Sequence, residues 1–185
     1  MDLQHLIYIM ARDILVSSYN FPVALKEVTF DPKFAVRGLS VDTKNGVLCK
    51  LNHVQRVGLK SVCKGKKILA PHEIEEIYGE SRHVSHSDMS QMKPLNDQFA
   101  MAEACLIADA IEMFEFVKAK TGENYSPSVV IEDVRSAIEE IHITRSLHRR
   151  VTEDLDRYIA PSPDLLPMLE HLRVSGKSLF LCTNR

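Results

Sequence analysis

The chain of 185 residues is long enough for one domain, or one domain with an inserted module, and its 45% hydrophobic and 26% charged residues are typical of a globular protein. A formal net charge of -2 argues against a general nucleic-acid-binding protein, which needs surplus basic side chains to neutralise phosphates. The sequence has no run of about 20 apolar residues and no basic amino-terminal region, so we expect neither a membrane span nor a signal peptide.

The four cysteines are spaced too widely to form a Cys-x-x-Cys pair, and two of them, Cys105 and Cys182, lie within apolar runs. This pattern predicts reduced thiols of an intracellular protein, with Cys105 and Cys182 in the core. Together with the absence of a targeting signal, it favours a cytoplasmic location.

Apolar residues near the amino terminus recur with the spacing of an amphipathic helix over residues 3–18. Residues 35–41 and 47–51 are β-prone and flank Asn45-Gly46, which predicts a hairpin because both residues tolerate positive φ. Alternation within 47–51 predicts a strand with one face more buried than the other. Residues 58–98 are mostly polar and are predicted as loop, apart from a short helix over 71–78 that ends at Gly79.

The second half of the sequence is predicted to be mainly helical. Residues 99–118 are apolar on most faces, as in a buried helix, and Ser126-Pro127 is a typical start for the next helix. Asp164 is predicted to cap a further helix whose Leu166, Leu169 and Leu172 face inward and which Gly176 ends. The apolar run 179–182 then predicts a central parallel strand.

Several segments resemble, in the same order, the cytosolic purine 5'-nucleotidases and related 5'-nucleotidase-domain proteins. The resemblance covers essentially the whole chain, and residues 6–20 resemble the helix that follows the family's first catalytic motif. The matching segments are residues 31–39 (DPKFAVRGL), 46–51 (GVLCKL), 76–79 (EIYG), 102–109 (AEACLIAD), 133–135 (DVR) with 141–142 (IH), and 179–184 (LFLCTN).

The resemblance implies a haloacid-dehalogenase type of α/β fold: a partial Rossmann-like core with an α+β cap. Residues 1–30 would hold the helix after the first motif, 31–150 the substrate-recognition cap, and 151–185 the start of the second half of the core. It implies Mg²⁺-dependent hydrolysis of purine nucleoside 5'-monophosphates through a phosphoaspartate.

The chain departs from that family in its catalytic motifs. The Asp-x-Asp-(Tyr/Phe)-Thr motif is expected just before residue 3 and does not occur elsewhere, and the lysine and acidic-pair motifs are expected beyond residue 185. Asp154-Leu155-Asp156 lies in a helical pattern rather than at a strand end, so it is not predicted to be the nucleophile. We therefore expect no catalytic residue, no magnesium ligand and no turnover in these 185 residues, as in a piece of a longer enzyme.

The resemblance makes Thr183 and Asn184 the phosphate-binding residues. A hydroxyl and an amide beyond the carboxyl end of a strand can donate hydrogen bonds to phosphate oxygens. Without the resemblance, the same residues are equally typical of an ordinary turn after a strand.

Arg135, Glu139 and His142 have the spacing of one helix face. This spacing is typical of a solvated stripe with an Arg–Glu pair, whereas the resemblance makes these residues nucleotide contacts. By the same resemblance Phe99 stacks on the purine with His142. Ala100, Glu139 and His148 stand where purine enzymes of the family have Asn, Asp and Lys, so these three changes leave the identity of the base open.

Two smaller clusters have simpler explanations. Arg145, Arg149 and Arg150 suit the carboxyl end of a helix as well as they suit phosphate, and His83 and His86 lack further metal ligands. Two functions remain open: a 5'-nucleotidase or a piece of one, or a non-catalytic module that binds nucleotide or associates with proteins. The expected partners are a purine nucleoside monophosphate and either a second copy or a full-length relative, but neither nucleic acid nor a membrane.

Overall fold

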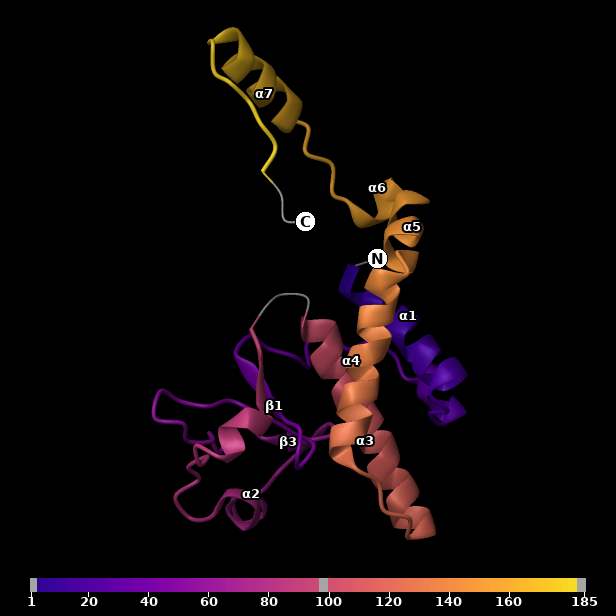
Figure 1. The fold of residues 1–185 in the computed structure, drawn as a ribbon, viewed down its shortest axis with the longest axis vertical. Coiled ribbons are helices and arrows are strands. Elements are labelled where there is room, and N and C mark those ends of the chain that lie inside the picture. The colour runs from indigo at the N-terminus through magenta and orange to yellow at the C-terminus, as the bar shows by residue number, and fades with distance from the viewer. Residues whose placement is uncertain (1–2, 97–99, 183–185) are drawn as a thin grey trace.

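The computed structural model describes residues 3–96 and 100–182. Three helices form its helical layer: α1 (Leu3–Ser18), α3 (Ala100–Thr121) and α4 (Pro127–Ile143). They pack side by side, with the sheet module beside α3 and α4 (Figure 1). All three were predicted from apolar spacing and end signals. Ser126 and Pro127 occupy the N-cap and first position of α4, as expected.

The sheet is antiparallel throughout and its strand order is β4-β3-β2-β1-β5. The strands are β1 (Leu39–Asp42), β2 (Val47–Cys49), β3 (Cys63–Lys64), β4 (Lys67–Ile68) and β5 (Met92–Leu95). β1 and β2 form the predicted hairpin, although residues 35–38 do not join the strand. β3, β4 and β5 lie in the region that the sequence predicted as loop, so that prediction was wrong.

Both faces of β2 are buried, which corrects the expected half-buried strand. Leu48 packs on the main core with α1, α3 and α4, whereas Val47 and Cys49 belong to a second apolar cluster. That cluster lies under α2 (Pro71–Tyr78), which contributes Ile74. α2 ends at Gly79 with φ of 72°, as predicted. Short 3-10 helices, η1 (Val23–Glu27) and η2 (Asp88–Gln91), complete this part of the chain.

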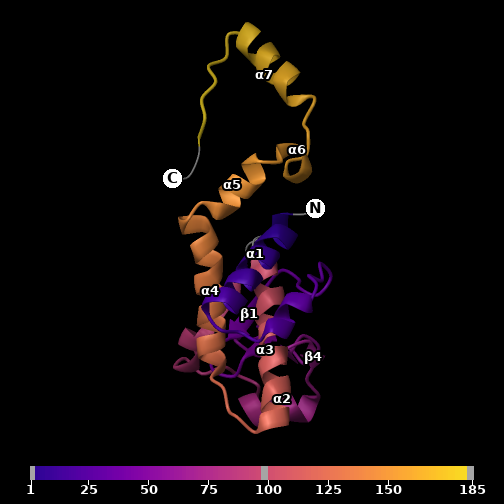
Figure 2. The same cartoon turned by 90° about the vertical axis from the view of Figure 1, so that its right-hand side faces the viewer.

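Beyond α4 the chain forms α5 (Ser146–Thr152), α6 (Leu155–Tyr158) and α7 (Leu165–Val174). α7 stands apart from the rest of the molecule in both views (Figures 1 and 2). It has no buried residue and Leu166 is 66% exposed, so the predicted inward-facing leucines are wrong. Asp164 and Gly176 do flank the helix as expected.

The predicted parallel strand at 179–182 is also absent from the structure. These residues have no regular structure, and Phe180 and Leu181 are 88% and 91% exposed. A strand needs a neighbour to satisfy its backbone N–H and C=O groups, and the described residues provide none beside this segment. Cys182 is consequently exposed rather than in the core, whereas Cys105 and Cys49 are buried.

The architecture is therefore a mixed α/β fold with a cap, in agreement with the fold class predicted from the sequence. The domain boundaries near residues 30 and 150 stay predictions. No helix in the described ranges is both long and apolar enough to cross a membrane.

An ionic contact between sheet and helix predicts how stability depends on pH. Lys64 of β3 lies 2.9 Å from the Glu115 carboxylate of α3, which also accepts a hydrogen bond from the Tyr125 hydroxyl at 2.5 Å. Burial tends to raise the pKa of Glu115, but the hydrogen bonds from Tyr125 and Lys64 outweigh it, and the pKa falls below its ordinary value of 4.5.

This lowered pKa means that ionised Glu115 stabilises the fold above pH 4.5, and that the stabilisation is lost as pH falls through the folded-state pKa. Because the side chain is partly exposed, we expect Glu115→Gln to lower the free energy of unfolding by less than about 1 kcal/mol at neutral pH. Urea unfolding at several pH values should show this difference shrinking below pH 4.5. A difference that is constant down to acid pH would contradict the assignment.

Candidate functional site

The polar face of α4 holds its arginine in a fixed position. Arg135 is half-buried, and its Nε donates a hydrogen bond to Oε1 of Glu103 at 2.8 Å. Glu103 lies in the first turn of α3, where a carboxylate is favoured by the helix dipole. The same turn is tied to α1, because the Ala102 N–H donates to the Gln4 side chain at 3.0 Å. The guanidinium is thus held in place through one nitrogen, and within the described residues its two Nη groups have no hydrogen-bond partner.

A groove of about 380 Å³ lies at the carboxyl end of α4. His142 of α4 and His148 of α5 both line it, and both side chains are exposed. The remaining lining is mostly apolar: Leu3, Leu147, Val151, Thr152, Leu155, Tyr158 and Ile159. An apolar trough with two imidazole rings suits a flat aromatic ligand, which gains affinity by stacking.

A strained residue shapes this groove. Arg145 has φ of 56° and ψ of 19°, the left-handed conformation, at the junction of α4 and α5. For a residue other than glycine this conformation costs about 1–2 kcal/mol. It turns the chain so that α5 leaves α4 at an angle, and His148 comes to line the groove that His142 lines. Arg149 and Arg150 lie in the last turn of α5, and Arg150 pairs with Glu153 at 3.6 Å.

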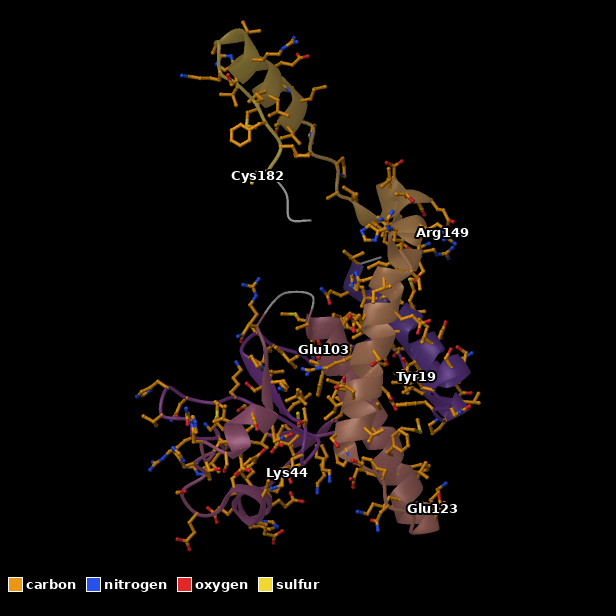
Figure 3. The ribbon with its side chains drawn as sticks, in the orientation of Figure 1. Tyr19, Lys44, Glu103, Glu123, Arg149 and Cys182 are labelled. Atoms are coloured by element: carbon orange, nitrogen blue, oxygen red, sulfur yellow. The ribbon has the colours of Figure 1, made fainter. Side chains whose placement is uncertain are left out.

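The structure brings some of the predicted binding residues together and leaves others unplaced. Arg135 lies seven residues before His142, which is about 10 Å along the helix axis, so they share the face expected from their spacing. Glu139 is exposed on α4 and does not line the groove. Phe99, Thr183 and Asn184 lie outside the described residues. Residues 175–182 run back from the end of α7, and Cys182 is labelled in Figure 3.

Sequence reasoning missed two contributors to this site. Glu103 lies within a segment that resembles the family, but only the packing of α3 on α4 shows that it holds Arg135. The groove walls from α1, α5 and α6 had no sequence signal, since they come together only in three dimensions. His83 and His86 are exposed loop residues, as predicted.

The described residues offer no metal site. Within residues 3–96 and 100–182, no three His, Cys, Asp or Glu side chains lie close enough to hold a metal ion. The described residues therefore do not form a magnesium site. Asp154 and Asp156 lie at the start of the short helix α6, away from any strand end.

A buried polar cluster fixes the helices that carry the site. Asp109 of α3 accepts a hydrogen bond from the Tyr8 hydroxyl of α1 at 2.7 Å and pairs with Lys66 of the β3–β4 turn at 2.5 Å. Tyr8 is fully buried, and burial followed by the hydrogen bond to Asp109 raises its pKa far above the ordinary value. The cluster joins α1, α3 and the sheet. It therefore helps to hold α3, whose first turn contacts α4, in its position.

Comparison with known proteins identifies the family. A model described as the 5' nucleotidase family matches residues 1–185. The chain belongs to the 5'-nucleotidase family. This agrees with the resemblance seen in its sequence segments.

Three relatives share this similarity over almost the whole chain. A 5'-nucleotidase domain-containing protein of Dictyostelium discoideum is 36% identical over 185 residues, which cover 99% of this chain and 30% of that protein. The 5'-nucleotidase domain-containing protein 2 of Rattus norvegicus is 28% identical, and that of Homo sapiens is 27% identical; each match covers 96% of this chain and 33% or 35% of the relative. The chain thus spans about a third of the length of these relatives.

Proposed function

We propose that this chain supplies the nucleotide-recognition face of a 5'-nucleotidase whose substrate is a purine nucleoside 5'-monophosphate. The observation that carries the proposal is the shared face of α4, on which Glu103 holds Arg135 and His142 joins His148 at an apolar groove. A charged donor on the same helix face as a groove that can stack an aromatic ring suits a base with polar edges.

Each residue has a distinct task in this proposal. The imidazole rings of His142 and His148 stack on the base while the apolar walls exclude water. The free Nη groups of Arg135 donate hydrogen bonds to acceptor atoms of the nucleotide, and Glu139 accepts from its donors. Phe99 covers the second face of the base, and Thr183 and Asn184 hold the 5'-phosphate.

We propose further that the complete enzyme hydrolyses its substrate through a phosphoaspartate with magnesium as cofactor, and that residues 1–185 alone bind nucleotide without turnover. The sequence of 185 residues has no Asp-x-Asp-(Tyr/Phe)-Thr motif to supply the nucleophile. Recognition residues cannot replace the missing covalent step. Phosphate release from purine monophosphates with magnesium, at a rate above the blank, would contradict the absence of turnover.

A non-catalytic, protein-associating role is the second candidate, favoured by the exposed apolar side chains of α7 and the tail. Leu166, Met168 and Phe180 are 66%, 51% and 88% exposed. A second copy or a full-length relative would cover them. Light scattering over a range of protein concentrations, with and without nucleotide, separates the two candidates. A purely associating protein should form dimers to the same extent in both cases.

We also propose a cytoplasmic location. All four cysteines are free thiols, as expected in a reducing compartment. Burial raises the pKa of Cys49 to about 12 and that of Cys63 to about 11, so both are inert.

Substitutions on α4 test the nucleotide site. We expect Arg135→Ala and His142→Ala each to weaken binding of a purine nucleoside 5'-monophosphate about tenfold, because each removes one interaction worth ~1.4 kcal/mol. Isothermal titration calorimetry measures the affinities. His86→Ala, which removes an exposed loop histidine, is the matched control and should bind like the wild type. Equal affinities in all four proteins would rule out the site on α4.

A further inference from the structure

A second groove, of about 480 Å³, lies on the sheet between the segment 33–39 and the β3–β4 hairpin. Four lysines line it: Lys33, Lys50, Lys60 and Lys66. Its described lining contains no aspartate or glutamate. This groove is far in sequence from the α4 site and has no part in the function proposed above.

The positive charge of the groove is largely uncompensated. Lys66 pairs with the buried Asp109, but no described acidic group pairs with Lys33, Lys50 or Lys60. Ammonium groups that line one concave, partly apolar surface reinforce each other's potential and attract an opposite charge. An anionic occupant would therefore be favoured, whereas a cationic one would be repelled.

The surface between the lysines is apolar. Phe34, Val36 and Leu39 line one side, and Ile68 lines the other. Val36 is 49% exposed and Ile68 is 70% exposed, so both are open to an incoming ligand. A simple phosphate would leave these side chains in water. The groove instead suits an occupant that has both carboxylates and apolar side chains.

The position of the groove beside an unpaired strand defines the conformation of that occupant. β4 is an outer strand of the sheet, and within the described residues no strand pairs with its far edge (β4 is labelled in Figure 2). An extended peptide can pair with such an edge, and its alternate side chains then point to opposite sides. A second copy of this chain is disfavoured as the occupant, because its own groove is lined by lysines and like charges repel each other.

We propose that this groove docks an extended acidic segment of a partner protein, with its carboxylates at Lys33, Lys50 and Lys60 and its apolar side chains on Val36 and Ile68. The edge of β4 supplies main-chain hydrogen bonds to the segment. The docking is independent of nucleotide, because the lysines lie outside the face of α4 that carries Arg135.

Fluorescence anisotropy with a short labelled peptide of alternating glutamate and valine tests this proposal. We expect saturable binding to the 185-residue protein, and binding at least about tenfold weaker to the double variant Lys50→Glu/Lys60→Glu. The control double variant Lys26→Glu/Lys93→Glu changes the net charge equally at two exposed lysines outside the groove, and should bind like the wild type. A peptide with lysine in place of glutamate should not bind.

The exposed Ile68 separates peptide docking from simple anion binding. Ile68→Ser leaves the charges and the core intact, and should weaken the acidic peptide several-fold without changing the binding of inorganic tripolyphosphate. Equal loss in the two double variants would mean that bulk charge alone attracts the peptide, and would overturn the proposal. Tripolyphosphate that displaces the peptide, combined with no effect of Ile68→Ser, would overturn it in favour of an anion site.

Discussion

Replacing Asp109 by alanine is expected to lower the free energy of unfolding by about 2–4 kcal/mol, because it breaks a buried charged cluster. The substitution leaves the hydroxyl of Tyr8, which is fully buried, without its acceptor at 2.7 Å. It also leaves Lys66 without its partner, although Lys66 is 30% exposed, and water moderates that part of the cost. Chemical denaturation followed by circular dichroism measures the change.

Two milder substitutions divide this loss into its parts. Tyr8→Phe removes only the hydroxyl and should lower the free energy of unfolding by about 1.5–3 kcal/mol, as the loss of a hydrogen bond to a charged group does. Asp109→Asn keeps an acceptor for Tyr8 but removes the charge that faces Lys66. Its loss of stability should therefore lie between those of Tyr8→Phe and Asp109→Ala. An Asp109→Ala protein as stable as the wild type would show that the cluster does not join α1, α3 and the sheet.

Replacing Gly65 by alanine is expected to lower the free energy of unfolding by about 2–5 kcal/mol, for two separate reasons. Gly65 has φ of 60°, and a side chain in that conformation costs about 1–2 kcal/mol. Its new Cβ would also lie 2.8 Å from the Cβ and 3.0 Å from the Cα of Glu112, and the second of these belongs to the backbone of α3. Overpacking of this kind costs about 1–3 kcal/mol, because the hairpin must move away from the helix.

Gly38→Ala is the matched control, since Gly38 has φ of 78° but no atom within 4 Å of the added Cβ. It therefore shares the conformational cost without the clash. In thermal unfolding, the melting temperature of Gly65→Ala should be well below that of Gly38→Ala. If the two melt together, the β3–β4 turn does not pack against α3 as closely as the structure has it.

Helices α1 to α4 and α7 could be predicted because their signals are local. Apolar spacing and end residues such as Pro127 and Gly79 act within a few residues, and packing then confirms what the sequence favours. Strands β3 and β4 have two residues each, too few for any alternation to be visible. β5 contains Pro94, which disfavours an interior strand but is tolerated here because β5 is an edge strand of the sheet.

In the candidate site, too, features that depend on nearby residues could be predicted, whereas features that depend on contacts between helices could not. The shared face of Arg135 and His142 follows from helical spacing alone. Glu103 and the left-handed Arg145 could not be predicted, because they depend on how α3, α4 and α5 meet. The apolar run at 179–182 indicated a strand. A strand forms only beside another strand, however, and the four residues of this run do not show whether one is present.

Nuclear magnetic resonance titration of the ¹⁵N-labelled protein with a purine nucleoside 5'-monophosphate tests the central proposal most directly. The account predicts that amide signals shift with saturation in the carboxyl half of α4, in α5 and in the first turn of α3, around Arg135, His142 and His148. Shifts confined to other surfaces, such as the lysine-lined groove, or no shifts at millimolar nucleotide, would contradict it.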